Sequence, residues 1–197
     1  ISFGIKQLLT GTYIYLDGSG TSKNPYTCQS AMLGHRGIYF SKSISFVSLR
    51  SRAYISCFYG NPWLVNGTEI KGGVQVSFSG LTFLNTSLRF VDALVIISDV
   101  VLTETKRVAL NVELLNLHRF ELSLKNVVFR QNAGCIIIDA ERSIISVNIT
   151  NTSFYENGKF SSNTPSILWL NSTINLINIQ IRNCVFKKNR FRGQGMM

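Results

Sequence analysis

The chain has 197 residues, of which 45% are hydrophobic and 15% charged, and it carries a formal net charge of +10. That much apolar material is sufficient for one domain with a continuous core over residues 1–197. No run of eighteen apolar residues occurs, which excludes a membrane-spanning helix. The basic balance favours anionic partners such as acidic polysaccharides, whereas nucleic acid is not expected because the chain contains no recognisable nucleic-acid-binding module.

Residues 1–71 precede the regular part of the chain. Apolar side chains at positions 1, 5, 8 and 9 have near-helical spacing, and residues 11–18 then alternate as in a strand. We therefore expect a short N-terminal helix, followed by irregular first coils. The helix would cover the edge of the first strand, which would otherwise be open to pairing with other chains.

A single pattern recurs through residues 72–190. Each copy contains alternating apolar residues, then Gly, Asp or Asn, then a bulky apolar residue three positions later, and Thr or Asn three positions after that. A strand pattern repeated at such short intervals is typical of a solenoid. The five copies span 74–86, 93–105, 120–132, 144–157 and 177–189, and their Gly, Asp or Asn positions are Gly80, Asp99, Asn126, Asn151 and Asn183.

The repeated pattern predicts a particular kind of β-structure. Alternation with a period of two places one set of side chains in the core and the other in solvent. Gly, Asp and Asn tolerate the left-handed backbone of a sharp turn, and stacked Asn side chains can hydrogen-bond from one coil to the next. No helix fits between the copies. The sequence therefore predicts an all-β protein, a parallel β-helix of seven or eight coils with three short strands in each.

Three of the copies end in Phe-x-x-Asn, at 129–132, 154–157 and 186–189. The chain resembles the right-handed parallel β-helix proteins that include the pectin-lyase-like group. The three segments resemble the F-x-x-N repeats of polymorphic outer-membrane proteins and related surface adhesins, although the copies ending at Thr86 and Thr105 depart from this motif. The resemblance implies right-handed coils and a location at the cell surface or outside the cell.

Four cysteines and five N-x-S/T sequons favour a secreted protein. Cys28 and Cys57 lie about one coil apart and are expected to form a disulfide. Cys135 and Cys184 fall on different strands, so their pairing is not expected. No Cys or His spacing suits a zinc site, and we expect no metal and no cofactor.

The repeat separates the sequons into two groups. Asn151 belongs to the hydrogen-bonded column of the repeat and is expected to point into the stack, so it should remain unmodified. The sequons expected to carry a glycan are Asn66, Asn85, Asn148 and Asn171.

The densest positive charge lies near the end of the last copy. One interpretation is an anion site for an acidic glycan; the other is a solvated end that resists edge-to-edge association. The tail, residues 191–197, has no pattern that would cover the last coil, which favours continuation in a longer chain, a partner, or end-to-end stacking of copies. The cluster consists of Arg182, Lys187, Lys188, Arg190 and Arg192.

Two aromatic residues are further candidates for ligand binding. Tyr59 and Trp63 lie in a loop-like stretch and would stack on sugar rings if exposed. The alternative is that this loop covers Leu94 and Ile96, which occupy outward positions of the one copy that is apolar on both faces.

Many β-helix proteins act on polysaccharides, and catalysis of that kind requires carboxylates on outward positions of adjacent coils. Asp139, Glu141 and Arg142 are the best candidates, since residues 139 and 141 share a face if the strand continues. The alternative is a polar turn after the strand that ends at Ile138.

The sequence favours an extracellular, non-catalytic β-helix module for adhesion, matrix formation or ligand binding, with an acidic glycan or an extracellular protein as its partner. A polysaccharide lyase or hydrolase, or its remnant, is the first alternative. A filament or coat component that stacks end to end is the second.

Overall fold

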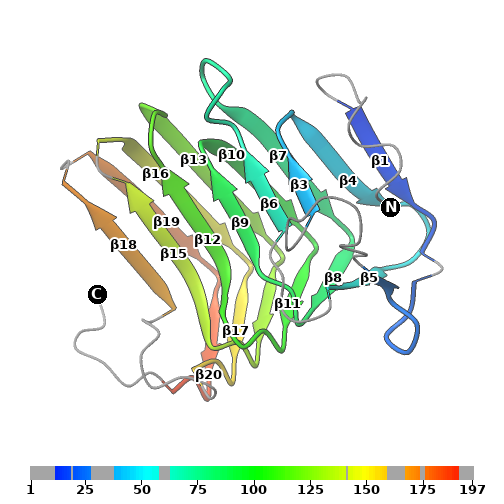
Figure 1. Cartoon of the computed structure of the whole chain (residues 1–197). Helices are drawn as coiled ribbons and strands as arrows, with labels where there is room; N and C mark the ends of the chain where they lie inside the picture. Colours follow the sequence, from blue (N-terminus) through cyan, green and yellow to red (C-terminus); the bar gives the residue numbers. More distant parts are fainter. Residues whose placement is uncertain are drawn as a thin grey trace.

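The computed structural model describes residues 12–18, 20–27, 38–57, 63–140, 142–158, 167–173 and 176–190. All regular secondary structure in these residues is β-strand, and the strands form three parallel sheets (Figure 1). The expected N-terminal helix falls on residues 1–10, outside the described residues. Within the described part of the chain, no helix has the length and hydrophobicity needed to cross a membrane.

We name the sheets A, B and C in the order in which the chain first enters them. Sheet A consists of β1 (Thr12–Leu16), β4 (Ile44–Ser48), β7 (Val74–Ser79), β10 (Ala93–Ser98), β13 (Arg119–Lys125), β16 (Ile144–Thr150) and β19 (Ile177–Arg182). Sheet B consists of β2 (Tyr26–Thr27), β5 (Ala53–Ser56), β8 (Leu81–Leu84), β11 (Val101–Thr103), β14 (Val128–Arg130), β17 (Ser153–Tyr155) and β20 (Val185–Lys187). Sheet C consists of β3 (Ile38–Phe40), β6 (Trp63–Asn66), β9 (Leu88–Val91), β12 (Val108–Leu114), β15 (Gly134–Ala140) and β18 (Leu168–Ser172).

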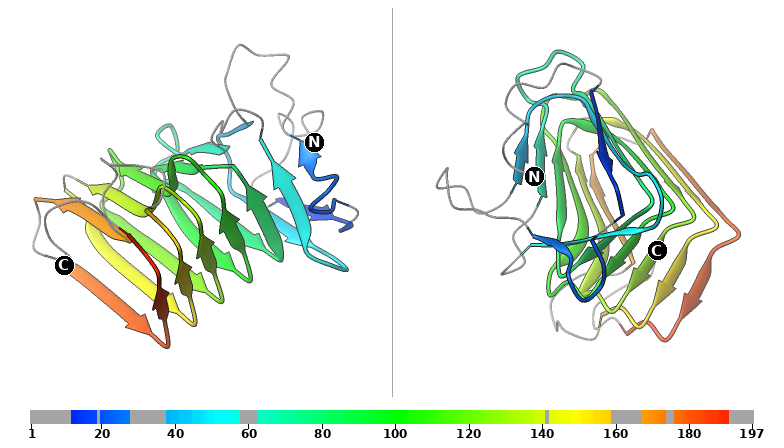
Figure 2. Two further views of the ribbon diagram at one scale, coloured as in Figure 1. Left: turned by 90° about the horizontal axis from the view of Figure 1, so that it is seen from below. Right: turned by 90° about the vertical axis from the view of Figure 1, so that its right-hand side faces the viewer.

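The chain visits the three sheets in turn, so each strand pairs with the strand three positions further along. We call three consecutive strands a rung; successive rungs stack along one direction (Figure 2). The buried apolar side chains of the three sheets form one core cluster. The register keeps equivalent repeat positions together, as Leu102 pairs with Phe129 and Phe129 with Phe154. Each predicted copy therefore supplies one strand of sheet A and the following strand of sheet B.

The corner between sheets A and B has the left-handed backbone that the repeat predicts. Gly80 has φ 70°, and Asp99, Asn126, Asn151 and Asn183 have φ between 51° and 56°. Glycine and asparagine adopt this region at little cost, which explains why the position accepts so few residue types.

A second left-handed column follows five strands of sheet B, namely β8, β11, β14, β17 and β20, and the repeat pattern does not predict it. Its residues are Asn85, Glu104, Gln131, Glu156 and Lys188, with φ between 46° and 62°. Glu, Gln and Lys rarely adopt positive φ, so their identities do not signal such a turn. Each of these turns is followed by a Thr or Asn whose side-chain oxygen accepts a hydrogen bond from a backbone N–H.

That following residue forms a buried amide ladder, which consists of Asn132, Asn157 and Asn189. Asn132 and Asn157 are fully buried. The Asn157 Oδ1 accepts from the backbone N–H and the side chain of Asn132, at 3.0 and 3.2 Å, and its Nδ2 donates to the carbonyl of Phe129 at 3.0 Å. Asn189 repeats this arrangement one rung further on. The Asn of the F-x-x-N motif therefore satisfies backbone groups that the core would otherwise leave without partners.

The ladder predicted at the A–B corner also forms, but on the surface. Asn126 donates to Asp99 at 2.9 Å and Asn151 donates to Asn126 at 3.3 Å. Asn151 is exposed, so the prediction that it points into the stack was wrong. The left-handed backbone turns this side chain outward at the corner while its amide still reaches the neighbouring rung.

Stacked aromatic rings form much of the core. Phe154 lies between Phe129 and Phe186, with ring centroids 5.0 Å apart on each side and interplanar angles of 5° and 0°. Towards the N-terminus, Trp63 packs among Phe46, Phe78 and Phe83. Trp63 is 1% exposed, so its prediction as a ligand-binding residue was wrong: it fills the core, because its strand points it inward.

Candidate functional site

The outer face of sheet C carries a row of polar side chains from four successive strands. Glu113 of β12 pairs in register with Asp139 of β15, and Asp139 pairs with Asn171 of β18. Arg89 of β9 and Asn111 of β12 share a second register column with Trp169 of β18. We call this surface the sheet C ledge; it consists of Arg89, Asn111, Glu113, Asp139, Trp169 and Asn171.

At the N-terminal end of the ledge, Arg89 and Glu113 form a bidentate ion pair. The Arg89 Nε and Nη2 donate to the two Glu113 carboxylate oxygens at 2.9 and 2.7 Å. The hydrogen bond to Glu113 raises the pKa of Arg89 above its ordinary value, although partial burial of the guanidinium acts in the opposite direction. Asn111 also donates to Glu113 at 3.3 Å. Paired, fork-shaped contacts of this kind hold both side chains in fixed orientations.

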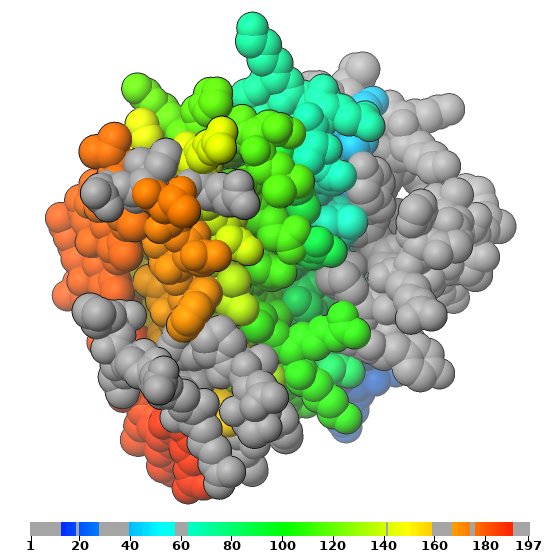
Figure 3. Space-filling view, turned by 60° about the vertical axis from the view of Figure 1, so that its left-hand side comes forward, coloured from blue at the N-terminus to red at the C-terminus, as the bar shows by residue number. Residues whose placement is uncertain are grey.

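At the other end of the ledge, an amide and a carboxylate lie beside an exposed aromatic ring. Asn171 Nδ2 donates to Asp139 Oδ1 at 3.0 Å. Trp169 is 46% exposed and lies two residues before Asn171 in β18, so both project from the same face of the strand. Figure 3 shows this side of the molecule, with β18 in orange beside the yellow-green and green surface of the preceding strands.

The arrangement is suited to hydrogen-bonding and stacking. Neighbouring strands are about 4.8 Å apart, so the ledge offers carboxylate, amide and guanidinium groups at regular intervals. Carboxylate and amide oxygens accept from hydroxyl groups, amide nitrogens donate to them, and an exposed indole ring binds apolar ring faces. These are the contacts that a hydroxyl-rich ring compound needs.

The predicted catalytic residues are only partly placed by the structure. Asp139 and Arg142 are both exposed, and Glu141 lies outside the described residues. The carboxylate beside Asp139 is that of Glu113, which the sequence prediction does not include. Glu113 follows Asp99 at nearly the same spacing at which Asp139 follows Asn126. The two intervals are 14 and 13 residues. Since a difference of one residue exchanges the two faces of a strand, counting from the repeat positions does not place the two carboxylates together.

The basic cluster predicted as one anion site is spread around the last rung. Arg182 projects from the outer face of sheet A, since it pairs with Thr150, and Lys187 projects from sheet B, since it pairs with Tyr155. Arg192 lies outside the described residues. The repeat itself separates these charges, because residues on either side of the corner at Asn183 belong to different sheets.

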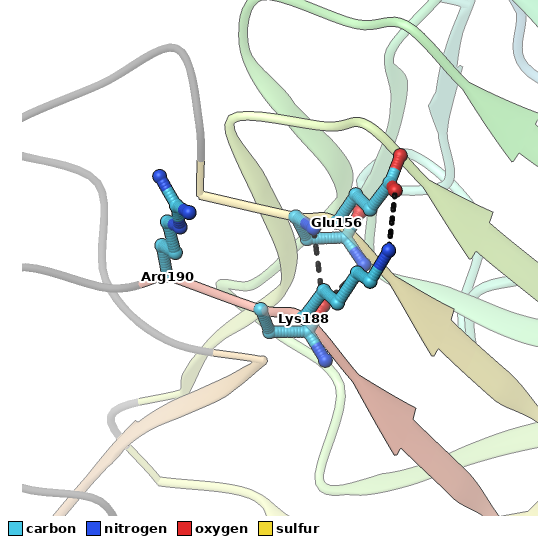
Figure 4. Close-up of a pocket in the computed structure, with 5 residues that line it drawn as sticks. Glu156, Lys188 and Arg190 are labelled. Carbon is cyan, nitrogen blue, oxygen red and sulfur yellow. Dashed lines mark hydrogen bonds and ion pairs between the residues drawn. The ribbon is translucent and has the colours of Figure 1, made fainter.

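Lys188 and Arg190 line a cavity of about 490 Å³ at this end of the stack, together with Glu156, Asn157 and Asn189. Lys188 Nζ lies 4.0 Å from a carboxylate oxygen of Glu156. In Figure 4 the Lys188 side chain extends toward Glu156, whereas Arg190 points away from both. The cavity thus has mixed charge, with Glu156 beside the two basic residues.

Leu94 and Ile96, the outward apolar residues of β10, differ in exposure. Ile96 is 40% exposed, whereas Leu94 packs against the core. Tyr59 and the loop that was expected to cover these residues lie outside the described residues. No group of three His, Cys, Asp or Glu side chains suited to a metal ion occurs in the part of the chain that the structure describes.

The cysteines fall into two classes. Cys135 and Cys184 are free thiols, and burial raises the pKa of the Cys135 thiol far above its usual range, so Cys135 stays protonated and unreactive. The Cys57 sulfur accepts a hydrogen bond from Trp63 Nε1 at 3.1 Å. Cys28 lies outside the described residues, and its disulfide with Cys57 stays a prediction.

The sequons occupy different positions on the sheets. Asn148 and Asn171 are exposed on strands, whereas Asn66 and Asn85 are half-buried. Within two sequons the threonine hydroxyl donates to the asparagine oxygen, from Thr68 to Asn66 at 2.8 Å and from Thr150 to Asn148 at 3.0 Å. Glycosylation of these sites stays a prediction. A glycan on Asn171 would occupy the sheet C ledge, because the amide nitrogen that would carry it is the one that donates to Asp139.

We expect Asn148 to carry a glycan and Asn151 to remain unmodified when the chain passes through a eukaryotic secretory pathway. Although Asn151 is exposed, its amide nitrogen donates to Asn126, and a glycan on the nearby Asn148 would crowd it. Glycopeptide mass spectrometry measures both occupancies. A glycan on Asn151 in the folded protein would show that the surface ladder is dispensable.

Fold and surface together define an all-β protein of stacked parallel sheets with a polar ledge on one face. No family model, curated protein or solved structure matches this chain.

Proposed function

We propose that the three sheets form a right-handed parallel β-helix that acts outside the cell as a non-catalytic binding module, with a polysaccharide held along the sheet C ledge. Pairing of every strand with the third strand along supports the β-helix, as does the agreement between the two seven-stranded sheets and the seven or eight coils predicted. The right hand of the coils and the extracellular location rest on the resemblance to surface adhesins and on the sequons.

The proposal for the ledge rests on one observation, the fixed arrangement of its polar side chains. Its polar groups come from consecutive strands in register, and hydrogen bonds join Arg89 to Glu113 and Asn171 to Asp139. Side chains held in this way lose little conformational freedom when a ligand binds, which favours affinity. Trp169 beside them adds apolar area for stacking.

The proposal predicts that the purified chain binds polysaccharide in a glycan array and that Trp169→Ala weakens binding by about tenfold or more, because the stacking area is lost. Asp139→Asn should weaken it about fivefold by removing a charge-assisted hydrogen bond. Ile96→Ala, a change at an exposed apolar residue on sheet A, serves as the control and should leave binding unchanged.

The salt dependence of polysaccharide binding distinguishes binding at the ledge from binding at the basic residues of the last rung. Binding through the ledge should persist at high salt, since its contacts are short-range. Binding that disappears at high salt and is insensitive to Trp169→Ala, but is lost on Lys187→Glu, would refute the ledge and support an acidic glycan at the last rung.

A polysaccharide hydrolase is the second candidate, and one pairing favours it. Glu113 and Asp139 are direct neighbours on adjacent strands, and their side chains project from the same face. Retaining glycosidases likewise use two neighbouring carboxyl groups, about 5–5.5 Å apart. Release of reducing ends from a bound polymer, abolished by Glu113→Gln, would establish this function in place of simple binding.

A further inference from the structure

The three sheets differ in the charge that their strands carry. The strands of sheet C contain one basic residue, Arg89, and two acidic residues, Glu113 and Asp139. Among the described strands, sheet C is therefore the one sheet in which acidic residues outnumber basic ones, although the chain has a net charge of +10. The charged strand residues of the other sheets are Arg119, Glu121, Lys125 and Arg182 in sheet A and Arg130 and Lys187 in sheet B.

Asp139 is the charge on sheet C that no neighbouring charge balances. The Arg89 guanidinium forms its bidentate pair with Glu113, at 2.9 and 2.7 Å. Asp139 accepts instead from the neutral amide of Asn171, at 3.0 Å. Among the described residues, no Lys or Arg forms an ion pair with Asp139. Since Asp139 is exposed, its carboxylate can accept a cationic group from a ligand.

An indole ring lies on the same face of the sheet as this carboxylate. Trp169 pairs with Ile137, and Asn171 pairs with Asp139, so Trp169 and Asp139 are diagonal neighbours on adjacent strands. Side chains in this relation are within reach of a long or aromatic group. An ammonium group is attracted both by a carboxylate and by the face of an indole ring. The two side chains together are therefore suited to a ligand that carries a primary ammonium group.

We propose that the polysaccharide on the sheet C ledge contains amino sugars with free amino groups, and that Asp139 binds one of their ammonium groups. This inference rests on the proposed function and names the class of its ligand. A uronate or sulfated polymer would instead bring an anion beside the carboxylates of Asp139 and Glu113, which is electrostatically unfavourable.

The probes are two oligosaccharides of the same linkage and length, one of glucosamine and one of N-acetylglucosamine. The full chain is produced in bacteria, so that Asn171 carries no N-glycan. Isothermal titration calorimetry in a mildly acidic buffer of low salt, in which the sugar amines are protonated, measures both affinities. We expect the glucosamine oligomer to bind about 3- to 30-fold more tightly, the range for one exposed ion pair together with a cation–π contact.

Three protein variants locate the preference. Asp139→Asn should remove it, while the N-acetylglucosamine oligomer should lose no more than about fivefold in affinity. Glu121→Gln removes the same charge from an exposed position on sheet A, so it is the matched control and should leave the preference unchanged. Arg89→Gln should increase the preference, because it leaves the Glu113 carboxylate without its cationic partner.

The possible outcomes separate this inference from the proposed function. Equal binding of the two oligomers, with both weakened by Trp169→Ala, would overturn the inference and leave the proposed function standing. Loss of the preference in Glu121→Gln as well as in Asp139→Asn would overturn it too, since the preference would then follow net charge alone. Failure of both oligomers to bind would also refute it, whereas the absence of any polysaccharide ligand in the glycan array would refute the proposed function as well.

Discussion

Asn157→Leu is expected to lower the free energy of unfolding by about 4 kcal/mol, because it leaves buried backbone groups without partners. The Asn157 side chain accepts from the Asn132 N–H at 3.0 Å and donates to the Phe129 carbonyl at 3.0 Å, and it is fully buried. Leucine has a similar volume, so the packing changes little, while these two hydrogen bonds and those with the side chains of Asn132 and Asn189 are lost. Urea unfolding followed by circular dichroism measures the effect.

The surface ladder supplies a matched control. Asn126→Gly removes an amide that also bonds to the neighbouring rungs, but at an exposed corner where glycine adopts the φ of 56° without strain. We expect a loss below about 1 kcal/mol, since water replaces the lost partners. Equal losses for the two variants would mean that burial of the inner ladder does not determine its contribution.

Phe154→Ala is expected to cost about 3–5 kcal/mol, the usual range for removing a buried phenylalanine. The Phe154 ring is 1% exposed and stacks on Phe129 and Phe186 at 5.0 Å on each side. Deleting the ring leaves a cavity that neighbouring rungs cannot close, because their backbones are held in register by hydrogen bonds. Thermal and urea unfolding of the variant test this.

Phe186→Ala is the appropriate comparison, since Phe186 occupies the same column one rung further on but is 50% exposed. Its replacement should cost less than half as much, because solvent already contacts one face of the ring. A loss as large as that of Phe154→Ala would indicate that the Phe186 ring is covered in solution.

The sequence predicts five of the seven strands in each of sheets A and B, because each copy of the repeat contains both strands and the corner between them at fixed spacing. Sheet C was not predicted strand by strand, since its strands lie outside the repeated pattern. The direction of the Asn151 side chain was also missed. Asn151 and Asn157 have the same residue type, and only the backbone conformation determines which of them enters the core.

The candidate site was harder to predict for a related reason. Glu113 and Asp139 come from strands whose alignment depends on the sheet C register, which the pattern of the repeat does not define. Trp63 and Trp169 show the same limit: one is 1% exposed and the other 46%, although both lie in strands of sheet C. Apolar alternation identifies a strand, but the face that meets the core must be known before an aromatic residue can be assigned to a surface.

The spacing of the repeats has a consequence for how this molecule could change its length. The A–B unit keeps almost the same length from its first copy, 74–86, to its last, 177–189, whereas the interval between successive units is short from Gly80 to Asp99 and long from Asn151 to Asn183. Nearly all variation therefore falls in the part that includes sheet C and its connections, where insertions leave the stacked columns intact. A duplicated segment spanning one interval would lengthen the stack by about 4.8 Å. Recombination between copies could therefore produce stacks with different numbers of rungs from one gene, with the same residue types in the core.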